Sequence, residues 1–387
     1  MKPFIQYLKP YLGKMSLGLF IKFVGTMMDL IIPWILAYII DTVVPLGSMK
    51  GVLLWGGAMI LAACIGLLGN VIANRMASKV ARDAVERIRH DLFAKISYLS
   101  AAQIDQFTLP SLISRLTSDT YNVHHMIGMM QRLGVRAPIL LLGGLIVTVI
   151  IDPVLAMVLF GVQPFIAILV IGVSKKGIPL YQALQSQVDG MIRILRENIT
   201  GVRIIKALSK GQQERLRYSD VNDKVRKSEK RVGKTMAITN PAMNLFLNGG
   251  LAMVILMGAF RINAGLSQPG IIIAFLTYFT LILNAMLSIS RIFILASKGF
   301  ASFGRIIEVL DTPEDLKVEP EDFVDKSPHI LFDNVSFSYY KTTPNLQNIS
   351  FSLEHGQTLG IIGPTGSGKS SLIRLLMRFY DCDSGTI

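Results

Sequence analysis

Charged residues and cysteines are both scarce in this chain of 387 residues. Only 17% of the residues are charged and 51% are hydrophobic, whereas roughly a quarter of the residues of a soluble domain are charged. The two cysteines, Cys64 inside an apolar block and Cys382 near the end, form no disulfide framework and have no metal-binding spacing. The low fraction of charged residues argues against an ordinary soluble protein, and the low number of cysteines argues against a disulfide-rich secreted protein.

The first residues do not resemble a cleavable signal peptide, because lysines interrupt the apolar residues. Phe4, Leu8, Tyr11 and Leu12 instead share one helical face. This spacing predicts a short helix lying on the cytoplasmic leaflet of a membrane.

Six apolar blocks are long enough, or nearly so, for a helix that crosses a bilayer, which needs about 20 residues. The third is short and is predicted to begin earlier, within 126–134. The blocks are Leu17–Ile40, Gly51–Ala73, Pro138–Ile151, Val154–Val173, Met236–Phe260 and Gly270–Leu295.

The connections between the blocks alternate in length. Those after blocks one, three and five are brief, whereas those after blocks two and four are long and basic, Asn74–Gly134 and Ser174–Thr235. From Arg203 to Lys234 there are eleven basic and four acidic residues. Basic loops stay in the cytoplasm, so we expect a multi-pass protein of the plasma or inner membrane with both termini cytoplasmic. The net charge of +13 is explained in this way, and we expect no nucleic-acid partner.

The two long segments keep helical periodicity. Ala77–Leu99 has apolar residues at helical spacing without Gly or Pro, and Ile178–Leu195 has a similar apolar spacing. We therefore expect the membrane helices to continue into the cytoplasm, turn and return as two hairpins, since structureless loops of this length are uncommon.

The composition changes after Leu310. A polar, acidic segment follows, and then alternating residues predict strands at Ile330–Tyr339 and Ile349–Leu353, with a short buried strand at Leu359–Ile362. The predicted fold is a membrane all-α domain at residues 1–310, a linker at 311–329 and the start of an α/β P-loop domain at 330–387.

A phosphate-binding motif follows the last predicted strand. Gly363-Pro364-Thr365-Gly366-Ser367-Gly368-Lys369-Ser370 matches G-x-x-x-x-G-K-[ST], and an amphipathic helix is predicted from Ser371 to Phe379. Backbone N–H groups of such a loop surround phosphate oxygens, the lysine reaches the outer phosphates and the serine hydroxyl binds Mg²⁺. The motif predicts that Gly363 to Ser371 bind ATP, with Ser370 as a ligand of its Mg²⁺.

With these elements the sequence resembles the exporter branch of the ABC transporters, which includes multidrug and lipid exporters. The resemblance rests on the strand and P-loop order and on Ile113–Asp119, Arg196–Lys206 and Phe300–Asp311. It implies that Tyr339 stacks on adenine, with Tyr340 as the alternative, whereas a tyrosine that only packs beside a strand would need no nucleotide. It also implies coupling helices at the hairpin tips, near Ser118–His124 and Ala207–Leu216.

The resemblance further implies the function and the partners. The chain would be one half of a dimeric, ATP-driven exporter that works by alternating access, with a second half-transporter, the lipid bilayer and an exported substrate as partners. Two alternatives are a degenerate ATP-binding partner in a heterodimer and a membrane sensor on the same scaffold. The signature, Walker B and switch motifs do not follow the P-loop, so we expect the natural protein to continue and this segment alone not to hydrolyse ATP.

A few polar residues lie within the apolar blocks. Lys22 and Asp29 are seven residues apart and share a helical face, and we expect Lys22 to reach the cytoplasmic interface. Intramembrane ionisable groups usually face a cavity or the helix bundle. The candidates for a substrate cavity are Asp29, Asn248, Asn284 and Arg291.

Overall fold

The computed structural model describes residues 2–316, 328–339, 341 and 343–387. Much of the predicted linker and the alternative adenine contact Tyr340 lie outside the described residues. The elements, in chain order, are α1 (Lys2–Leu8), α2 (Leu12–Tyr38), α3 (Met49–Ser97), α4 (Ala101–Phe107), α5 (Leu109–Ser114), α6 (Thr120–Ile151), α7 (Pro153–Thr200), α8 (Val202–Ala207), α9 (Gly211–Ala237), α10 (Thr239–Asn263), α11 (Pro269–Leu310), β1 (Ile330–Phe337), β2 (Leu346–Leu353), α12 (Lys369–Leu376) and β3 (Ser384–Thr386).

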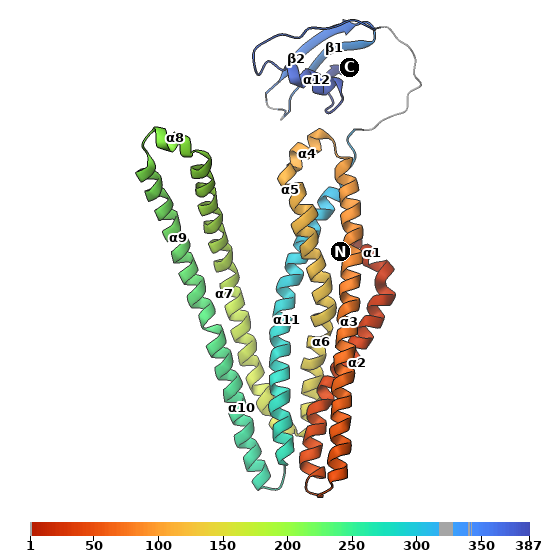
Figure 1. Cartoon of the computed structure of the whole chain (residues 1–387), viewed down its shortest axis with the longest axis vertical. Helices are drawn as coiled ribbons and strands as arrows, with labels where there is room; N and C mark the ends of the chain where they lie inside the picture. Colours follow the sequence, from red (N-terminus) through yellow and green to blue (C-terminus); the bar gives the residue numbers. More distant parts are fainter. Residues whose placement is uncertain (1, 317–327, 340, 342) are drawn as a thin grey trace. The chain divides into compact units, whose positions relative to one another are not determined.

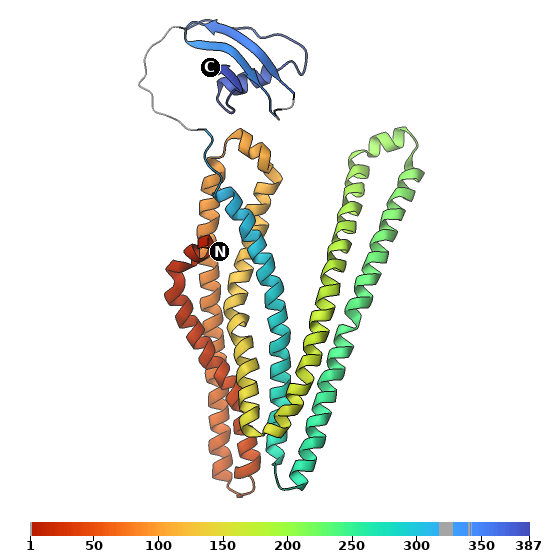
Figure 2. The ribbon, with the colours of Figure 1, turned by 180° about the vertical axis from the view of Figure 1, so that it is seen from behind.

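Six helical stretches of the described chain are long and apolar enough to cross a membrane. They run well past the apolar blocks, because α3 has 49 residues and α7 has 48. The predicted number of spans and the predicted helical extensions are therefore confirmed. Figures 1 and 2 show the long helices from opposite sides.

The chain forms two compact units, which we describe separately. The helical unit contains 13–78 and 128–295, and the P-loop unit contains 1–12, 79–127 and 296–387. Long helices such as α3, α6 and α11 contribute residues to both.

The core of the helical unit is apolar and is bounded by carboxylates at helix ends. Phe275, Tyr278 and Phe279 of α11 are at most 1% exposed and form its centre. Asp152 accepts hydrogen bonds from the first N–H groups of α7 and pairs with Arg261 at 3.0 Å. The brief connection predicted between the third and fourth blocks is thus confirmed, and N-capping by Asp152 stabilises the start of α7.

The P-loop unit has two cores. In the first, the end of α3, the start of α6 and the end of α11 bury residues such as Ile88, Leu92 and Ile306 completely. The predicted N-terminal helix packs here: Phe4 is 8% exposed and lies edge-on to Phe303 with ring centroids 5.1 Å apart. Much of the face predicted to meet lipid therefore contacts protein.

The second core of the P-loop unit lies under a small sheet. Its strands are antiparallel in the order β2-β1-β3. Phe332, Val335 and Phe337 of β1 pack against Leu372 and Leu375 of α12.

One strand prediction was wrong. Residues 359–362 form no strand within the described part of the chain, and Ile362 is 96% exposed. An apolar run becomes a buried strand only where neighbouring strands accept its backbone hydrogen bonds, and the sheet of the described residues offers no such neighbour.

The tips of the hairpins differ from the prediction. The short helices at the turns are α4 and α8 (Figure 1), so residues 118–124 lie in the arm of the first hairpin instead of at its tip. Ser100 starts α4 with a capping box to Gln103, a local signal that fixes a helix start. The second predicted segment, Ala207–Leu216, begins at the last residue of α8 and continues into α9.

Candidate phosphate-binding site

The P-loop connects the exposed residues after β2 to α12. Gly366 and Gly368 have φ angles of 91° and 90°, which side chains other than glycine rarely adopt. Gly368 also lies so close to β2 that a Cβ atom there would meet the Leu346 side chain at 2.6 Å. These two constraints explain why the loop needs glycine at both positions.

Lys369 is the first residue of α12 and bends back across the loop. Its Nζ donates to the carbonyl oxygens of Gly363 and Pro364, both at 2.8 Å, and lies 3.5 Å from the Ser367 hydroxyl. The ammonium group is therefore held over the loop at the end of the helix where backbone N–H groups are free, which favours anions.

The remaining P-loop residues leave room for a ligand. Thr365, Gly366 and Ser370 are exposed, and a Cβ at Gly366 would meet no atom within 4 Å. The residues present therefore fit a triphosphate: the loop N–H groups and Lys369 would hold the phosphates, and the Ser370 hydroxyl would bind Mg²⁺.

Tyr339 lies beside the helix that follows the loop. Its hydroxyl donates to Ser371 Oγ at 3.2 Å and accepts from Arg374 Nη1 at 3.2 Å. Its ring is edge-on to Phe337 and Tyr380, with centroids 4.8 Å and 5.1 Å away. The structure thus places Tyr339 beside the P-loop helix, while adenine stacking stays a prediction.

Two residues close to Tyr339, Arg374 and Tyr380, have raised pKa values. The hydrogen bond to Tyr339 raises the pKa of exposed Arg374. Burial, assisted by a 2.6 Å hydrogen bond to Asp105 of α4, raises the pKa of Tyr380 to about 12. Tyr380 therefore remains a neutral donor at physiological pH.

The four candidates for a substrate cavity are not brought together by the contacts of the described residues. Asp29 pairs with Arg136 of α6 at 3.1 Å. Asn284 donates to the Thr280 carbonyl of its own helix, and Asn248 and Arg291 are exposed. A shared cavity for these residues stays a prediction.

The position predicted for the Lys22 side chain was wrong. Lys22 is only 3% exposed, and its Nζ donates to Asn74 Oδ1 of α3 at 3.1 Å. It shares a helix with Asp29 as expected, but a neighbouring amide, distant in sequence, holds it inside the protein instead of letting it reach the interface.

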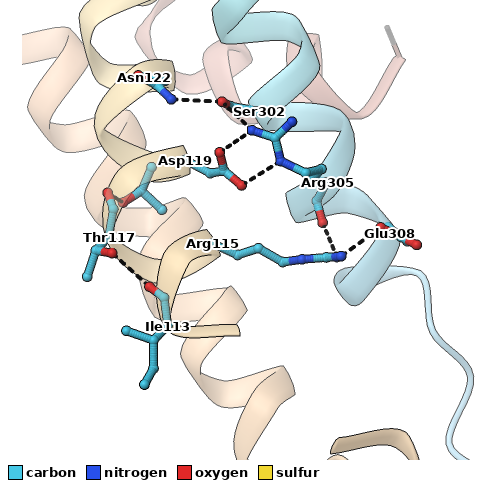
Figure 3. Close-up of polar contacts among 9 residues, drawn as sticks. Ile113, Arg115, Thr117, Asp119, Asn122, Ser302, Arg305 and Glu308 are labelled. Atoms are coloured by element: carbon cyan, nitrogen blue, oxygen red, sulfur yellow. Dashed lines mark hydrogen bonds and ion pairs between the residues drawn. The ribbon is translucent and has the colours of Figure 1, made fainter. Parts of the chain in front are cut away.

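Sequence reasoning assigned no role to a polar network that ties the first hairpin to the end of α11 (Figure 3). Arg305 donates to Asp119, with Nε and Oδ2 2.9 Å apart, and Arg115 pairs with Glu308 at 2.9 Å. Arg115 also donates to the Arg305 carbonyl at 2.6 Å. Alternating basic and acidic residues at helical spacing in both segments are the signal that could have indicated it.

The fold and the site define a multi-pass membrane protein with a P-loop nucleotide-binding motif. The family model described as "ABC transporter transmembrane region" matches residues 15–286, and the model described as "ABC transporter" matches 346–387. The chain therefore belongs to the ABC transporter family, as its sequence motifs predicted.

Several curated relatives match along the chain. The uncharacterized ABC transporter ATP-binding protein YfiB of Bacillus subtilis is 30% identical over 388 residues, covering 100% of this chain and 68% of the relative. The putative ABC transporter ATP-binding protein exp8 of Streptococcus pneumoniae is 28% identical, covering 100% of this chain and 67% of the relative. A fatty acid ABC transporter ATP-binding/permease protein of Mycobacterium tuberculosis is 26% identical over 85% of this chain and 52% of the relative. The chain thus spans about two thirds of the length of the first two.

Proposed function

We propose that the protein uses ATP to export a substrate across the cytoplasmic membrane as one half of a dimeric ABC transporter. The observation that carries this proposal is the P-loop geometry, in which Lys369 is held over a glycine loop on the same chain as six membrane-spanning helices. A P-loop binds nucleotide phosphates, and ATP hydrolysis can supply the energy that moves a substrate across the membrane against its gradient.

The path from nucleotide to membrane would use the network of Figure 3. It joins the first hairpin to the end of α11, the helix that leads toward the P-loop. The carboxylate of Asp119 is 4% exposed in its pair with Arg305, whose own side chain is 50% exposed, so one partner of the pair is held inside the protein. Such a contact would transmit a displacement of the nucleotide-binding part to the membrane helices.

The dimer, the export direction and the cytoplasmic termini belong to the same proposal. The basic segment between Arg203 and Lys234 supports cytoplasmic hairpins. The other half-transporter would supply the groups that complete hydrolysis opposite each P-loop, as the family resemblance implies.

The test is Lys369→Ala in the protein expressed from its complete gene and reconstituted in liposomes. We expect ATPase activity and ATP-driven movement of substrate to fall by about 100-fold, since a lost charge clamp on the phosphates removes several kcal/mol of transition-state stabilisation. Lys341→Ala is the matched control, because that lysine is exposed and lies outside the loop.

The result also separates the alternatives. Wild-type protein that hydrolyses ATP without moving substrate would favour a sensor, and wild-type protein that binds ATP without hydrolysing it would favour a degenerate partner. Accumulation of substrate inside inside-out vesicles would support export, whereas depletion would contradict it.

A further inference from the structure

A cluster of polar side chains lies on three membrane-spanning helices of the helical unit. The helices pack closely here, since a Cβ on Gly25 of α2 would meet backbone atoms of α3 at 3.3 Å. The P-loop site does not use these side chains. They are Lys22 and Asp29 on α2, Asn70, Asn74 and Ser78 on α3, and Arg132 and Arg136 on α6.

Each basic residue of this cluster is held by a partner on another helix. Lys22 donates to Asn74 at 3.1 Å, Arg136 donates to Asp29 at 3.1 Å, and Arg132 donates to the Ser78 hydroxyl. Arg132, Arg136 and Asp29 also act electrostatically on Lys22. The three cations therefore belong to one electrostatic environment.

The cluster is not electrically balanced. It contains three basic side chains and one acidic one, and Asn74 and Ser78 are neutral. Lys22 is 3% exposed, so water does not compensate its charge. Buried charge without compensation is costly, and ionisable groups at membrane depth usually have a function.

Some buried polar atoms of the cluster also make no hydrogen bond within the described part of the chain. Among the described residues, the buried Nε atoms of Arg132 and Arg136 find no hydrogen-bond partner, and neither does Asn70 Oδ1. The Arg136 side chain is still 38% exposed and that of Asp29 is 22% exposed. The cluster thus has free donors, excess positive charge and an accessible side.

The ligand that satisfies these conditions carries negative charge and accepts hydrogen bonds. Carboxylates and phosphates match the planar guanidinium donors of arginine. On both α2 and α6 the cluster is followed by apolar core residues, among them Leu30, Ala137 and Leu140. An amphipathic molecule could place its acidic group at the cluster and its apolar part along these helices.

We propose that Lys22, Arg132 and Arg136 form a subsite for the acidic head group of an amphipathic substrate, an inference that rests on the transport function proposed above. A cluster with a purely structural role would gain from balanced charge, and a cationic substrate would be repelled.

The test measures equilibrium binding without nucleotide, in full-length protein in nanodiscs of zwitterionic lipid. The probes share one chain and differ in the head group: oleate, oleoyl lysophosphatidate and the uncharged oleyl alcohol. We expect one or both acids to bind at least about tenfold more tightly than the alcohol, the gain expected from one charge-assisted hydrogen bond. The two acids distinguish a carboxylate from a phosphate substrate.

Variants assign the effect to the cluster. Arg132→Gln with Arg136→Gln should weaken binding of the acid about tenfold or more. Lys176→Gln, which removes an exposed charge on α7, is the matched control and should leave binding unchanged. Asp29→Asn removes the competing carboxylate and should tighten binding, an effect of opposite sign that structural damage would not produce.

Three results would overturn the proposal: equal binding of acid and alcohol, unchanged binding in the folded double glutamine variant, or an equal loss in Lys176→Gln. If the double glutamine variant does not fold, Arg132→Lys with Arg136→Lys should bind the acid and Asp29→Asn should bind it more tightly, and failure of both refutes the subsite. Because binding is measured without ATP, absence of ATP-driven transport would count against the proposed function and leave the binding result standing.

Discussion

The two long hairpins of this protein differ in how they are stabilised. In the first, Leu92 of α3 and Val123 of α6 are 0% exposed, and Asp119 and Arg115 bond to α11. In the second, the apolar residues near the tip are exposed, with Ile204 at 66% and Leu216 at 65%. The first hairpin therefore buries apolar residues of its arms within its own unit, although Leu109 near its tip is 61% exposed, while the tip of the second hairpin leaves Ile204 and Leu216 uncovered.

The ion pairs repeat this contrast. Arg305 pairs with an Asp119 that is 4% exposed, whereas Arg217 and Glu197 of the second hairpin are each 48% exposed. Exposed pairs contribute about 0–1 kcal/mol. Within the described part of the chain, the second hairpin is therefore held mainly by the packing of α7 against α9 and α10. Its exposed apolar tip supports the proposed dimer, in which a partner would cover it.

The largest expected effect comes from the buried core of the first hairpin. Leu92→Ala should lower the free energy of unfolding by about 2–5 kcal/mol, because it removes a fully buried side chain and leaves a cavity. Leu216→Ala is the matched change on the second hairpin and should cost less than about 0.5 kcal/mol, as for other exposed sites. Thermal unfolding of the detergent-solubilised protein measures both.

Equal losses in the two variants would contradict the comparison, since they would mean that Leu216 is buried in the isolated protein. A loss of ATPase activity in Leu216→Ala without a loss of stability would support a functional contact at the second tip.

The next effect comes from the network of Figure 3. Arg305→Ala leaves the nearly buried carboxylate of Asp119 without its cation and should cost about 3 kcal/mol, at the lower end for a broken buried pair because Arg305 itself is half exposed. Arg217→Ala, the matched control on the second hairpin, should cost at most about 1 kcal/mol.

Chemical denaturation at two salt concentrations sharpens this test. High salt should reduce the contribution of Arg217 by a larger fraction than that of Arg305, because both partners of the Arg217 pair are exposed, whereas the Asp119 carboxylate is buried and is screened less. If both contributions respond equally to salt, the Arg305 pair is not protected as described.

The features predicted correctly from sequence depend on local information. Apolar block length sets the number of spans, and the missing Gly and Pro between Ala77 and Leu99 indicate continuous helix. The P-loop was found in the same way, because its glycines and lysine are contiguous and their backbone conformation is set locally.

The predictions that were wrong concern residues whose structural partners are distant in sequence. Whether Lys22 reaches the interface depends on Asn74, 52 residues away. Whether residues 359–362 form a strand depends on neighbouring strands that their own pattern cannot specify. The charge imbalance around Arg132 and Arg136 was missed for the same reason, since only the fold places them beside α2 and α3.

The smallest expected effect concerns the tips themselves. The helix α4 starts with a capping box in which Ser100 Oγ accepts from the Gln103 N–H at 3.2 Å, and the Ser100 hydroxyl also donates to Asp315 at 2.7 Å. The helix α8 starts at Val202, and its N-cap residue Gly201 provides no side-chain cap. Tip opening should therefore be rarer in the first hairpin than in the second.

Ser100→Ala should reduce this difference. Loss of an N-cap costs about 1 kcal/mol, which corresponds to roughly fivefold faster hydrogen exchange of the α4 amides if they exchange by local opening. Ser219→Ala, an exposed change on α9, should leave exchange in both tips unchanged. If α4 exchanges as fast as α8 in the unmodified protein, the tips do not differ in stability, and the contrast between the hairpins is confined to their arms.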